Sequence, residues 1–432
     1  MAWDFSTEPE FEEKLEWIRG FVRERVEPLD LLWPGRVYEP PTPEVRAVID
    51  PLKDEVRRRG LWACHLGPEL GGQGFGAVKL ALMNEILGRS HWAPLIFGTQ
   101  APDTGNAEIL ARFGTEAQKQ RYLRPLLNGE LFSCYSMTEP QAGADPSLFV
   151  TRATRDGDGW VIEGRKFFSS NARTAAFLIV MAVTDPEAPL TERMSMFLVP
   201  TDTEGVRIVR NIGLMAEAFD DGKHALIHYD QVRVPAEALL GEVGKAFAIA
   251  QARLGGGRIH HAMRTIGVCS RALDMLCERA LSRRTADGRL ADKQAVQFYV
   301  ADSWTQLMQF RLLVLYTAWL IDQRDTRGAR KEIAAVKSIT PQVQHDIVQR
   351  AIQVHGALGV SNELPLGRMW MHVPVMGIVD GPTEVHKVTV ARQVLREHSP
   401  AEGEWPSEHV PTRLAAAREM LAEQIEHVVA NS

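Results

Sequence analysis

The stretch Tyr135-Ser-Met-Thr-Glu-Pro-Gln-Ala-Gly-Ala-Asp145 leads into a region of short β-branched runs and decides how the chain is interpreted. It offers backbone amides, a threonine hydroxyl and glycine turns, which can hold a flat, hydrogen-bonding ligand without using charge. A second stretch, Asp380-Gly-Pro-Thr-Glu-Val-His386, lies near the end of a helical region. It places one carboxylate, Asp380, before a Gly-Pro turn that predicts a helix start at Thr383.

Hydrophobic periodicity divides the chain around these stretches. Helical spacing predicts helices over 11–26, 43–59, 77–88 and 107–122. Short apolar runs predict strands over 160–163, 177–183, 196–199, 206–209 and 225–229, with a hairpin turn at Asp156-Gly-Asp-Gly159. Long helices are predicted again over 245–284, 290–325, 332–358 and 383–396.

These patterns predict an α+β protein with four parts. We expect an N-terminal α-helical domain (1–131), a middle β-barrel or sandwich domain (132–242), a C-terminal four-helix bundle (243–398) and a tail (399–432). The tail is predicted to contain a further helix over 412–429.

Composition excludes several classes of partner and site. The net charge of −6 with intermixed charges provides no basic face for nucleic acid. The four cysteines form no CxxC pair or His/Cys metal spacing, so we expect no metal and reduced thiols, as in a cytoplasmic protein. The glutamate-rich N-terminus lacks an apolar leader core, and the longest apolar run, 312–321, is about half of the ~20 residues that a bilayer helix needs. No membrane span is expected.

Common catalytic motifs are missing from the sequence. The glycine-rich run Gly71–Gly76 satisfies part of a dinucleotide fingerprint, but no convincing strand precedes it, so a loop between two helices is the better interpretation. The sequence also contains no P-loop, HExxH or GxSxG motif. Redox chemistry with a flavin held outside a Rossmann fold remains.

An ordered set of motifs resembles the acyl-CoA dehydrogenase family over about residues 10–397. The set comprises Phe-Gly-Thr-Glu-Ala-Gln-Lys-Gln-Arg-Tyr-Leu (113–123), Thr138-Glu-Pro, Gly164-Arg-Lys-Phe-Phe-Ser-Ser-Asn171, Arg283-Arg-Thr285, Gln353-Val-His-Gly356 and Asp380-Gly-Pro-Thr-Glu384. The resemblance implies an FAD enzyme that oxidises an acyl-CoA thioester to the trans-2-enoyl-CoA and passes electrons to an electron-transfer flavoprotein.

The resemblance also implies roles for individual residues. Those expected to bind FAD are Tyr135, Met137, Thr138, Phe168, Ser170, Pro382 and Glu384, together with Arg283, Thr285, Gln353 and Gly356 reaching from an adjoining subunit of a homodimer or homotetramer. Those expected near the substrate are Ala144, Arg258 and Gly381. Ala144 and Pro382 replace a Ser and a Thr that are common in the family, which puts details of the CoA and pyrophosphate contacts in doubt.

The family's catalytic base aligns with Asp380. Some relatives instead carry the base directly before the position of Arg258, where this chain has Gly257, which cannot act as a base. An Asp-Gly-Pro base motif resembles the branch that in animals is fused to phosphotransferase-like domains, of which this chain is expected to hold the dehydrogenase part. Histidines 260 and 261 have no metal partner at a useful spacing, and packing or hydrogen bonding is expected of them.

Two alternatives stay open at this point. The same fold serves nitroalkane oxidases, acyl-CoA oxidases and flavin monooxygenases, and it also serves non-catalytic binding proteins, including DNA-associated ones. The length, branching and hydroxylation of the acyl chain do not follow from the sequence.

Overall fold

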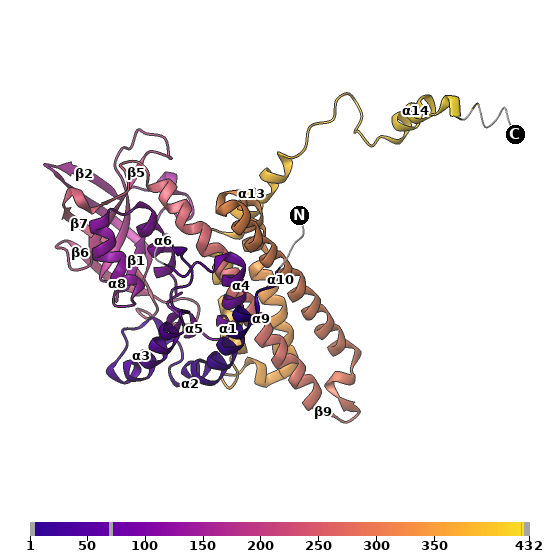
Figure 1. The fold of residues 1–432 in the computed structure, drawn as a ribbon, viewed down its shortest axis with the longest axis horizontal. Coiled ribbons are helices and arrows are strands. Elements are labelled where there is room, and N and C mark those ends of the chain that lie inside the picture. Colours follow the sequence, from indigo (N-terminus) through magenta and orange to yellow (C-terminus); the bar gives the residue numbers. More distant parts are fainter. Residues whose placement is uncertain (1–4, 69–71, 425, 427–432) are drawn as a thin grey trace. The chain divides into compact units, whose positions relative to one another are not determined.

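The computed structural model describes residues 5–68, 72–424 and 426 (Figure 1). The chain through Lys387 forms one compact unit, and the chain from Val388 onward forms a second, smaller unit.

The N-terminal region is helical. Its α-helices are α1 (Pro9–Phe21), α2 (Glu27–Leu32), α3 (Pro43–Arg58), α4 (Gly76–Leu87), α5 (Ala93–Ile96), α6 (Asp103–Phe113), α7 (Glu116–Gln118) and α8 (Arg124–Leu127). The prediction of one helix over 107–122 was wrong. Gly114 is extended, and a capping box between Thr115 and Gln118 starts a new helix there.

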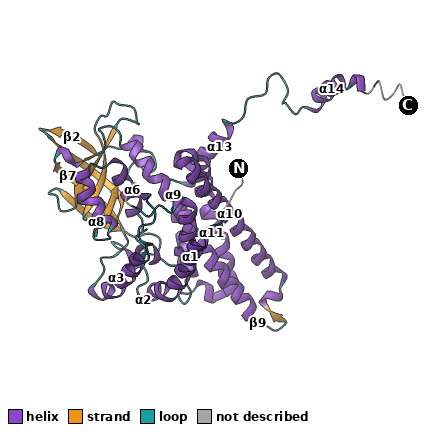
Figure 2. Ribbon diagram, viewed as in Figure 1, coloured by secondary structure: helices purple, strands orange, loops and turns teal. Residues whose placement is uncertain are grey.

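The middle region is one eight-stranded sheet (Figure 2). Its strands are β1 (Ser133–Ser136), β2 (Arg152–Asp156), β3 (Gly159–Ser170), β4 (Phe177–Val183), β5 (Met194–Pro200), β6 (Val206–Ile212), β7 (His224–Val234) and β8 (Leu239–Leu240). The order is β6-β7-β3-β2-β4-β5-β8, and β1 pairs in parallel with β4. All the predicted strands and the hairpin that pairs Asp156 with Gly159 are confirmed. β4 is buried throughout, which explains its unbroken apolar sequence.

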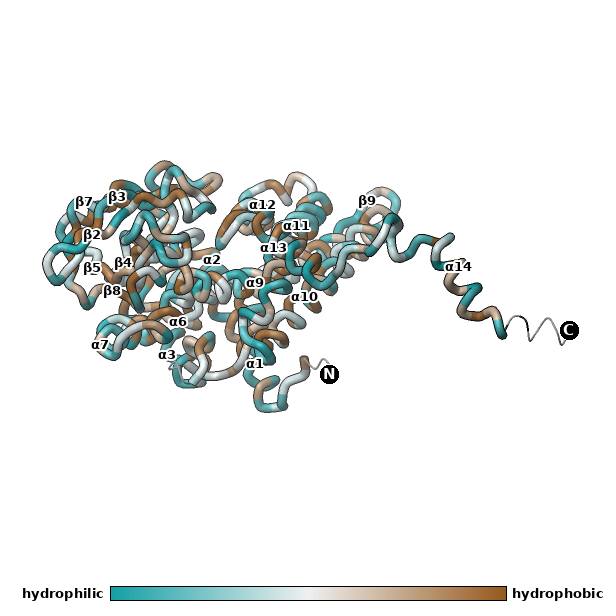
Figure 3. The backbone as a smooth tube through the Cα atoms, turned by 90° about the horizontal axis from the view of Figure 1, so that it is seen from above, coloured by the Kyte–Doolittle hydropathy of each residue, from teal (hydrophilic) through white to brown (hydrophobic). Residues whose placement is uncertain are grey.

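Long helices follow the sheet. They are α9 (Ala246–Ser282), α10 (Gln294–Gly328), α11 (Arg330–His355) and α12 (Leu366–Ile378), with a hairpin of β9 (Arg284–Thr285) and β10 (Gly288–Arg289) between α9 and α10. The helices α9, α10 and α11 pack against one another, and α12 packs against α11. Figure 3 shows hydrophobic and hydrophilic residues alternating along α9, α10 and α11, as in helices that bury one face.

The predicted helix set needs one correction. α12 was not predicted, because its apolar run shows no clear period and contains Gly367 and Pro374. The predicted fourth helix, 383–396, is present as α13 (Thr383–Leu395), but α12 is the helix that packs on α11. In the tail, α14 (Val410–Met420) falls partly within the predicted helix 412–429, of which 425 and 427–429 lie outside the described residues.

The described residues show the surroundings of the glycine-rich run and of the cysteines. No strand occurs between Leu61 and Pro68, and from Gly72 the glycine-rich run leads into α4; Gly71 lies outside the described residues. All four cysteines are free thiols, and the described residues contain no cluster suited to a metal ion. Within the same residues, every helix is too short or too polar to cross a bilayer.

Candidate active site

Asp380 occupies the turn between α12 and α13. Its φ of 55° is left-handed, which is uncommon for a residue with a side chain and often marks a functional position. Two side chains hold its backbone: Arg258 Nε donates to the main-chain oxygen at 2.9 Å, and His386 Nε2 donates to the same oxygen at 3.3 Å. The side chain is 14% exposed, and its carboxylate accepts no hydrogen bond from any described residue. The turn is therefore fixed while the carboxylate is left available.

Two members of a row of residues on α9 face this carboxylate. Arg253, Gly257 and His261 are spaced four apart, so they lie along one face of the helix. His261 Nε2 lies 3.6 Å from Asp380 Oδ2, and a Cβ added to Gly257 would lie 2.6 Å from the same oxygen. Gly257 cannot act as a base, as the sequence already showed. Its lack of a side chain leaves room for the carboxylate of Asp380.

Two cationic side chains, the buried Lys337 and the half-buried Arg258, lie near Asp380. Burial lowers the pKa of Lys337 to about 8, and the nearby Asp380 carboxylate opposes this shift. Burial also lowers the pKa of Arg258, again against the effect of Asp380. His261, whose pKa burial lowers to about 4, is neutral at pH 7. One carboxylate therefore lies in the field of two positive charges, of which one is buried, and beside a neutral imidazole.

Tyr135 borders the same site from β1. Burial raises its pKa to about 12, with Arg253 opposing the shift and the Asp380 carboxylate adding to it. Its hydroxyl is buried with no hydrogen-bond partner among the described residues. The guanidinium carbon of Arg253 lies 3.9 Å from the centroid of the Tyr135 ring. The site therefore combines elements from β1, α9, α11 and the α12–α13 turn.

The predicted flavin-binding residues of the sheet lie on the ends of β1 and β3. Phe167 N donates to Thr138 O at 2.8 Å, which joins the segment after β1 to β3. Phe168 has a φ of 54° and is 42% exposed, an unusual degree of exposure for an aromatic ring in a sheet. Ser170 Oγ lies 2.9 Å from His224 Nδ1. The structure thus brings Tyr135, Met137, Thr138, Phe168 and Ser170 into neighbouring strand ends.

The other predicted residues are distributed differently. Gly381 and Pro382 continue the Asp380 turn, whereas Glu384 and Ala144 are exposed. Arg283 and Thr285 lie by the β9–β10 hairpin, at the end of α9 far from the sheet (Figure 1), and Gln353 and Gly356 lie at the end of α11. All four are exposed, and nothing within this one chain brings them to Asp380.

Sequence reasoning missed Arg253, His261 and Lys337 as site residues. Helical spacing could have indicated Arg253 and His261, because both lie four residues from Gly257 on a predicted helix. Lys337 had none, since it lies on a different helix and only packing brings it near Asp380.

A buried ion pair supports the segment that carries Met137 and Thr138. Lys166 Nζ lies 2.8 Å from Glu139 Oε1 and donates to Met137 O at 2.7 Å, and both charged side chains are fully buried. Glu139 also accepts hydrogen bonds from the backbone amides of Val150 and Thr151. Burial by itself raises the pKa of Glu139, but Lys166 and these hydrogen bonds outweigh burial and hold that pKa below its ordinary value.

We expect Lys166→Met to lower the free energy of unfolding by about 3–5 kcal/mol, because it leaves the Glu139 carboxylate buried and unpaired. Urea denaturation measures the change. Arg152→Gln is the matched control, since it breaks the exposed Arg152–Glu163 pair at 2.7 Å, and it is expected to cost about 1 kcal/mol or less. Equal costs for the two variants would contradict the role assigned to the buried pair.

Buried histidines make the fold sensitive to acid. Burial lowers the pKa of His65 to about 3, and both of its ring nitrogens are enclosed without a partner among the described residues. The unfolded chain protonates near pH 6.5, so it binds protons before the folded chain does, and stability is lost as the pH falls from about 6.5 toward 3. We expect His65→Leu to reduce this loss by roughly 1 kcal/mol per pH unit, measured as urea midpoints at pH 7.5 and 5. An unchanged slope would show that His65 is charged or exposed in the folded protein.

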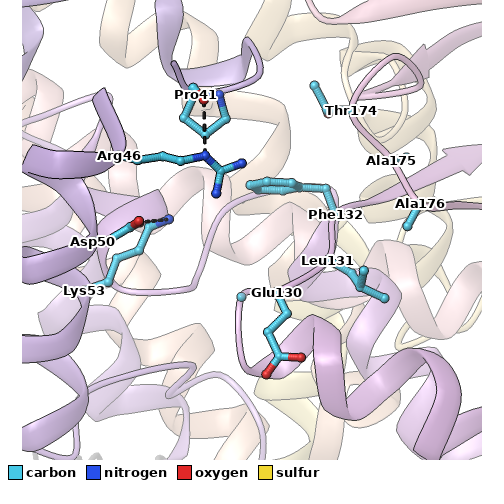
Figure 4. Close-up of a pocket in the computed structure, with 11 residues that line it drawn as sticks. Pro41, Arg46, Asp50, Lys53, Glu130, Leu131, Phe132, Thr174, Ala175 and Ala176 are labelled. Carbon is cyan, nitrogen blue, oxygen red and sulfur yellow. Dashed lines mark hydrogen bonds and ion pairs between the residues drawn. The ribbon is translucent and has the colours of Figure 1, made fainter. Parts of the chain in front are cut away.

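A separate pocket of about 250 Å³ lies between α3 and the loops 129–132 and 174–176 (Figure 4). Its charged side chains already have partners: Arg46 Nε donates to Pro41 O at 3.3 Å, and Lys53 Nζ lies 3.8 Å from Asp50 Oδ1. None of the predicted site residues lines this pocket. The chemistry is therefore assigned to the surroundings of Asp380 and not to this pocket.

Three family models match the chain in order. The N-terminal domain of acyl-CoA dehydrogenases matches residues 8–130, the middle domain matches residues 134–228, and the C-terminal domain matches residues 244–395.

Individual relatives agree with these models. "Probable acyl-CoA dehydrogenase FadE2" of Mycobacterium tuberculosis is 45% identical over 82% of this chain and 87% of its own length. Human "Acyl-CoA dehydrogenase family member 11" is 40% identical over 82% of this chain but only 45% of its own length, so this chain spans less than half of that relative.

Solved structures share the fold. A putative acyl-CoA dehydrogenase from Mycobacterium abscessus superposes with a TM-score of 0.84 at 36% identity, covering 91% of this chain and 100% of that one. Butyryl-CoA dehydrogenase from Megasphaera elsdenii does so with a TM-score of 0.78 at 26% identity and the same coverage. With its helical, sheet and helical regions matched in order, the chain belongs to the acyl-CoA dehydrogenase family and is an oxidoreductase.

Proposed function

We propose that this protein uses FAD to oxidise the Cα–Cβ bond of an acyl-CoA thioester to the trans-2-enoyl-CoA. The observation that carries the proposal is the carboxylate of Asp380, which is mostly buried, free of hydrogen bonds from described residues and fixed through its backbone by Arg258 and His386. Removing a proton next to a thioester requires a base of this kind.

The residues at the ends of β1 and β3 fit a flavin. Phe168 presents an exposed ring beside the segment that carries Met137 and Thr138. The Asn171 side-chain oxygen is buried without a partner among the described residues, and such a group calls for an explanation such as a bound cofactor. When bound, FAD would supply the hydride acceptor for Cβ.

The side chains around Asp380 would prepare the proton transfer. Asp380 would take the α-proton, while Lys337 and Arg258 would keep the surroundings positive as negative charge moves onto the thioester carbonyl. The neutral His261 would limit where the carboxylate can point, since its ring lies 3.6 Å from Oδ2.

Anaerobic mixing with a panel of acyl-CoAs tests the proposed reaction. The visible absorption band of the bound flavin is expected to bleach with at least one member of the panel. Oxygen consumption with nitroalkanes, without bleaching by any acyl-CoA, would instead assign the protein to the nitroalkane oxidases. A protein that bleaches with acyl-CoA and then consumes oxygen rapidly would be an acyl-CoA oxidase.

The electron acceptor and the assembly are part of the proposal. We propose an electron-transfer flavoprotein as the acceptor and a homodimer or homotetramer in the cytoplasm as the working form. The exposure of Arg283, Thr285, Gln353 and Gly356 suits a cofactor shared between subunits, and α10 also exposes Phe298 and Trp304. If the assembly is required, diluting the protein to monomers will release FAD, which fluorescence detects.

A further inference from the structure

Arg253 is a nearly buried cation with hydrogen-bonding capacity left over. It is 9% exposed, and its one hydrogen bond to a described residue runs from Nε to Asn106 Oδ1 at 2.8 Å. No carboxylate oxygen of a described residue lies within 4 Å of its guanidinium nitrogens. Buried charges in proteins are normally paired, because taking an unpaired charge out of water is costly.

The acidic side chains near Arg253 have other partners. Glu108 pairs with Arg112 at 2.9 Å, and Asp103 accepts hydrogen bonds from the backbone and the side chain of Ser133. Arg253 lowers the pKa of both carboxyl groups through space, although burial, the larger effect, raises each of them. The two terminal nitrogens of Arg253 thus remain available for an acceptor that the protein itself does not supply.

Tyr135 provides a second free donor at the same place. Its ring is stacked under the Arg253 guanidinium, and its hydroxyl is buried without a partner among the described residues. Two nearly buried side chains in contact, both with unused donors, indicate a site for an oxygen acceptor.

The position of Arg253 relates this site to the reacting carbon. Arg253 precedes Gly257 by one helical turn on the α9 row, and Gly257 faces the Asp380 carboxylate. Four residues rise about 6 Å along the helix axis. This spacing along α9 matches the length of a short acyl chain that passes Asp380 and ends at Arg253.

We infer that the preferred substrate carries a carboxylate at the far end of a short acyl chain, as a dicarboxylic acid does when one end is a CoA thioester. A carboxylate matches the planar fork of a guanidinium and neutralises its charge, whereas a hydroxyl group would leave the charge uncompensated. This inference rests on the proposed acyl-CoA oxidation and specifies its substrate class.

Two acyl-CoAs of equal chain length test the inference on the FAD-loaded protein. We expect kcat/KM for adipyl-CoA to exceed that for hexanoyl-CoA by about tenfold or more, measured with a dye as electron acceptor. Equal or reversed values, or a stronger preference for 4-hydroxyhexanoyl-CoA than for adipyl-CoA, would overturn it. Flavin bleaching by hexanoyl-CoA alone would leave the proposed function intact, whereas no bleaching by any acyl-CoA would refute that function as well.

Substitutions distinguish a role of Arg253 in substrate recognition from a role in packing. Arg253→Met is expected to lower the adipyl-to-hexanoyl ratio by about tenfold or more, mainly through KM for adipyl-CoA, and Arg253→Lys to lower it less. Arg155→Met is the matched control, because Arg155 lies 4.1 Å over the Trp160 ring in the sheet, and it should leave the ratio unchanged. Equal losses with both substrates in Arg253→Met would show that Arg253 only supports the fold. If Arg253→Met does not fold, the preference of the unmodified protein still decides the matter.

Discussion

Asp380→Asn is expected to slow flavin reduction by acyl-CoA by about 10³ to 10⁴-fold, because the amide cannot accept the α-proton. The fold should be retained. Asn has nearly the same shape as Asp and tolerates the left-handed φ of 55°, and the contacts of Arg258 and His386 go to the backbone oxygen and not to the side chain. Anaerobic stopped-flow absorbance measures the rate, with FAD content and melting temperature as controls for folding.

A second substitution of Asp380 tests how the rate depends on the position of the carboxylate. Asp380→Glu keeps a base but moves its oxygens by one methylene group toward α9, so a partial rate is expected. Reduction of the Asn variant at the rate of the unmodified protein would mean that another group takes the proton. It would also remove the main support for the proposed function.

Gly257→Ala is expected to lower the rate of flavin reduction by about 10 to 100-fold while leaving the protein folded. The added Cβ would lie 2.6 Å from Asp380 Oδ2, so the carboxylate must rotate away from its position. A displacement of about 1 Å at a reacting group can cost a hundredfold in rate. The helix itself should gain stability, since Ala is favoured over Gly by about 1 kcal/mol in a helix interior.

Opposite effects on rate and stability distinguish this prediction from general damage. Gly255→Ala is the matched control on the same helix, because its Cβ would make only an ordinary contact, at 3.7 Å from Thr326 Cβ. It should raise helix stability similarly with little effect on the rate. Equal rates for the two alanine variants would show that Asp380 does not depend on the space beside Gly257.

Much of the fold was predictable because local patterns and tertiary structure agree. The buried strand β4 was readable from its unbroken apolar run, and the β2–β3 turn from Asp156-Gly-Asp-Gly159. The helix α12 was not readable, since its burial depends on its position against α11 and leaves no period in the sequence. The break at Gly114 was readable in principle, from the capping box that follows it.

The sequence by itself determined the family motifs, the succession of a helical, a β-rich and a second helical region, and the identity of the carboxylate in the Asp-Gly-Pro turn. Only the tertiary structure decided what surrounds that carboxylate. Arg253 and His261 come from α9, Lys337 from α11 and Tyr135 from β1, and these elements are widely separated along the chain. Local propensity acts over a few residues, whereas the charge and burial of a site depend on which distant elements pack together. For that reason, the free donors of Arg253 and Tyr135, and the space that Gly257 leaves, became visible only in the folded chain.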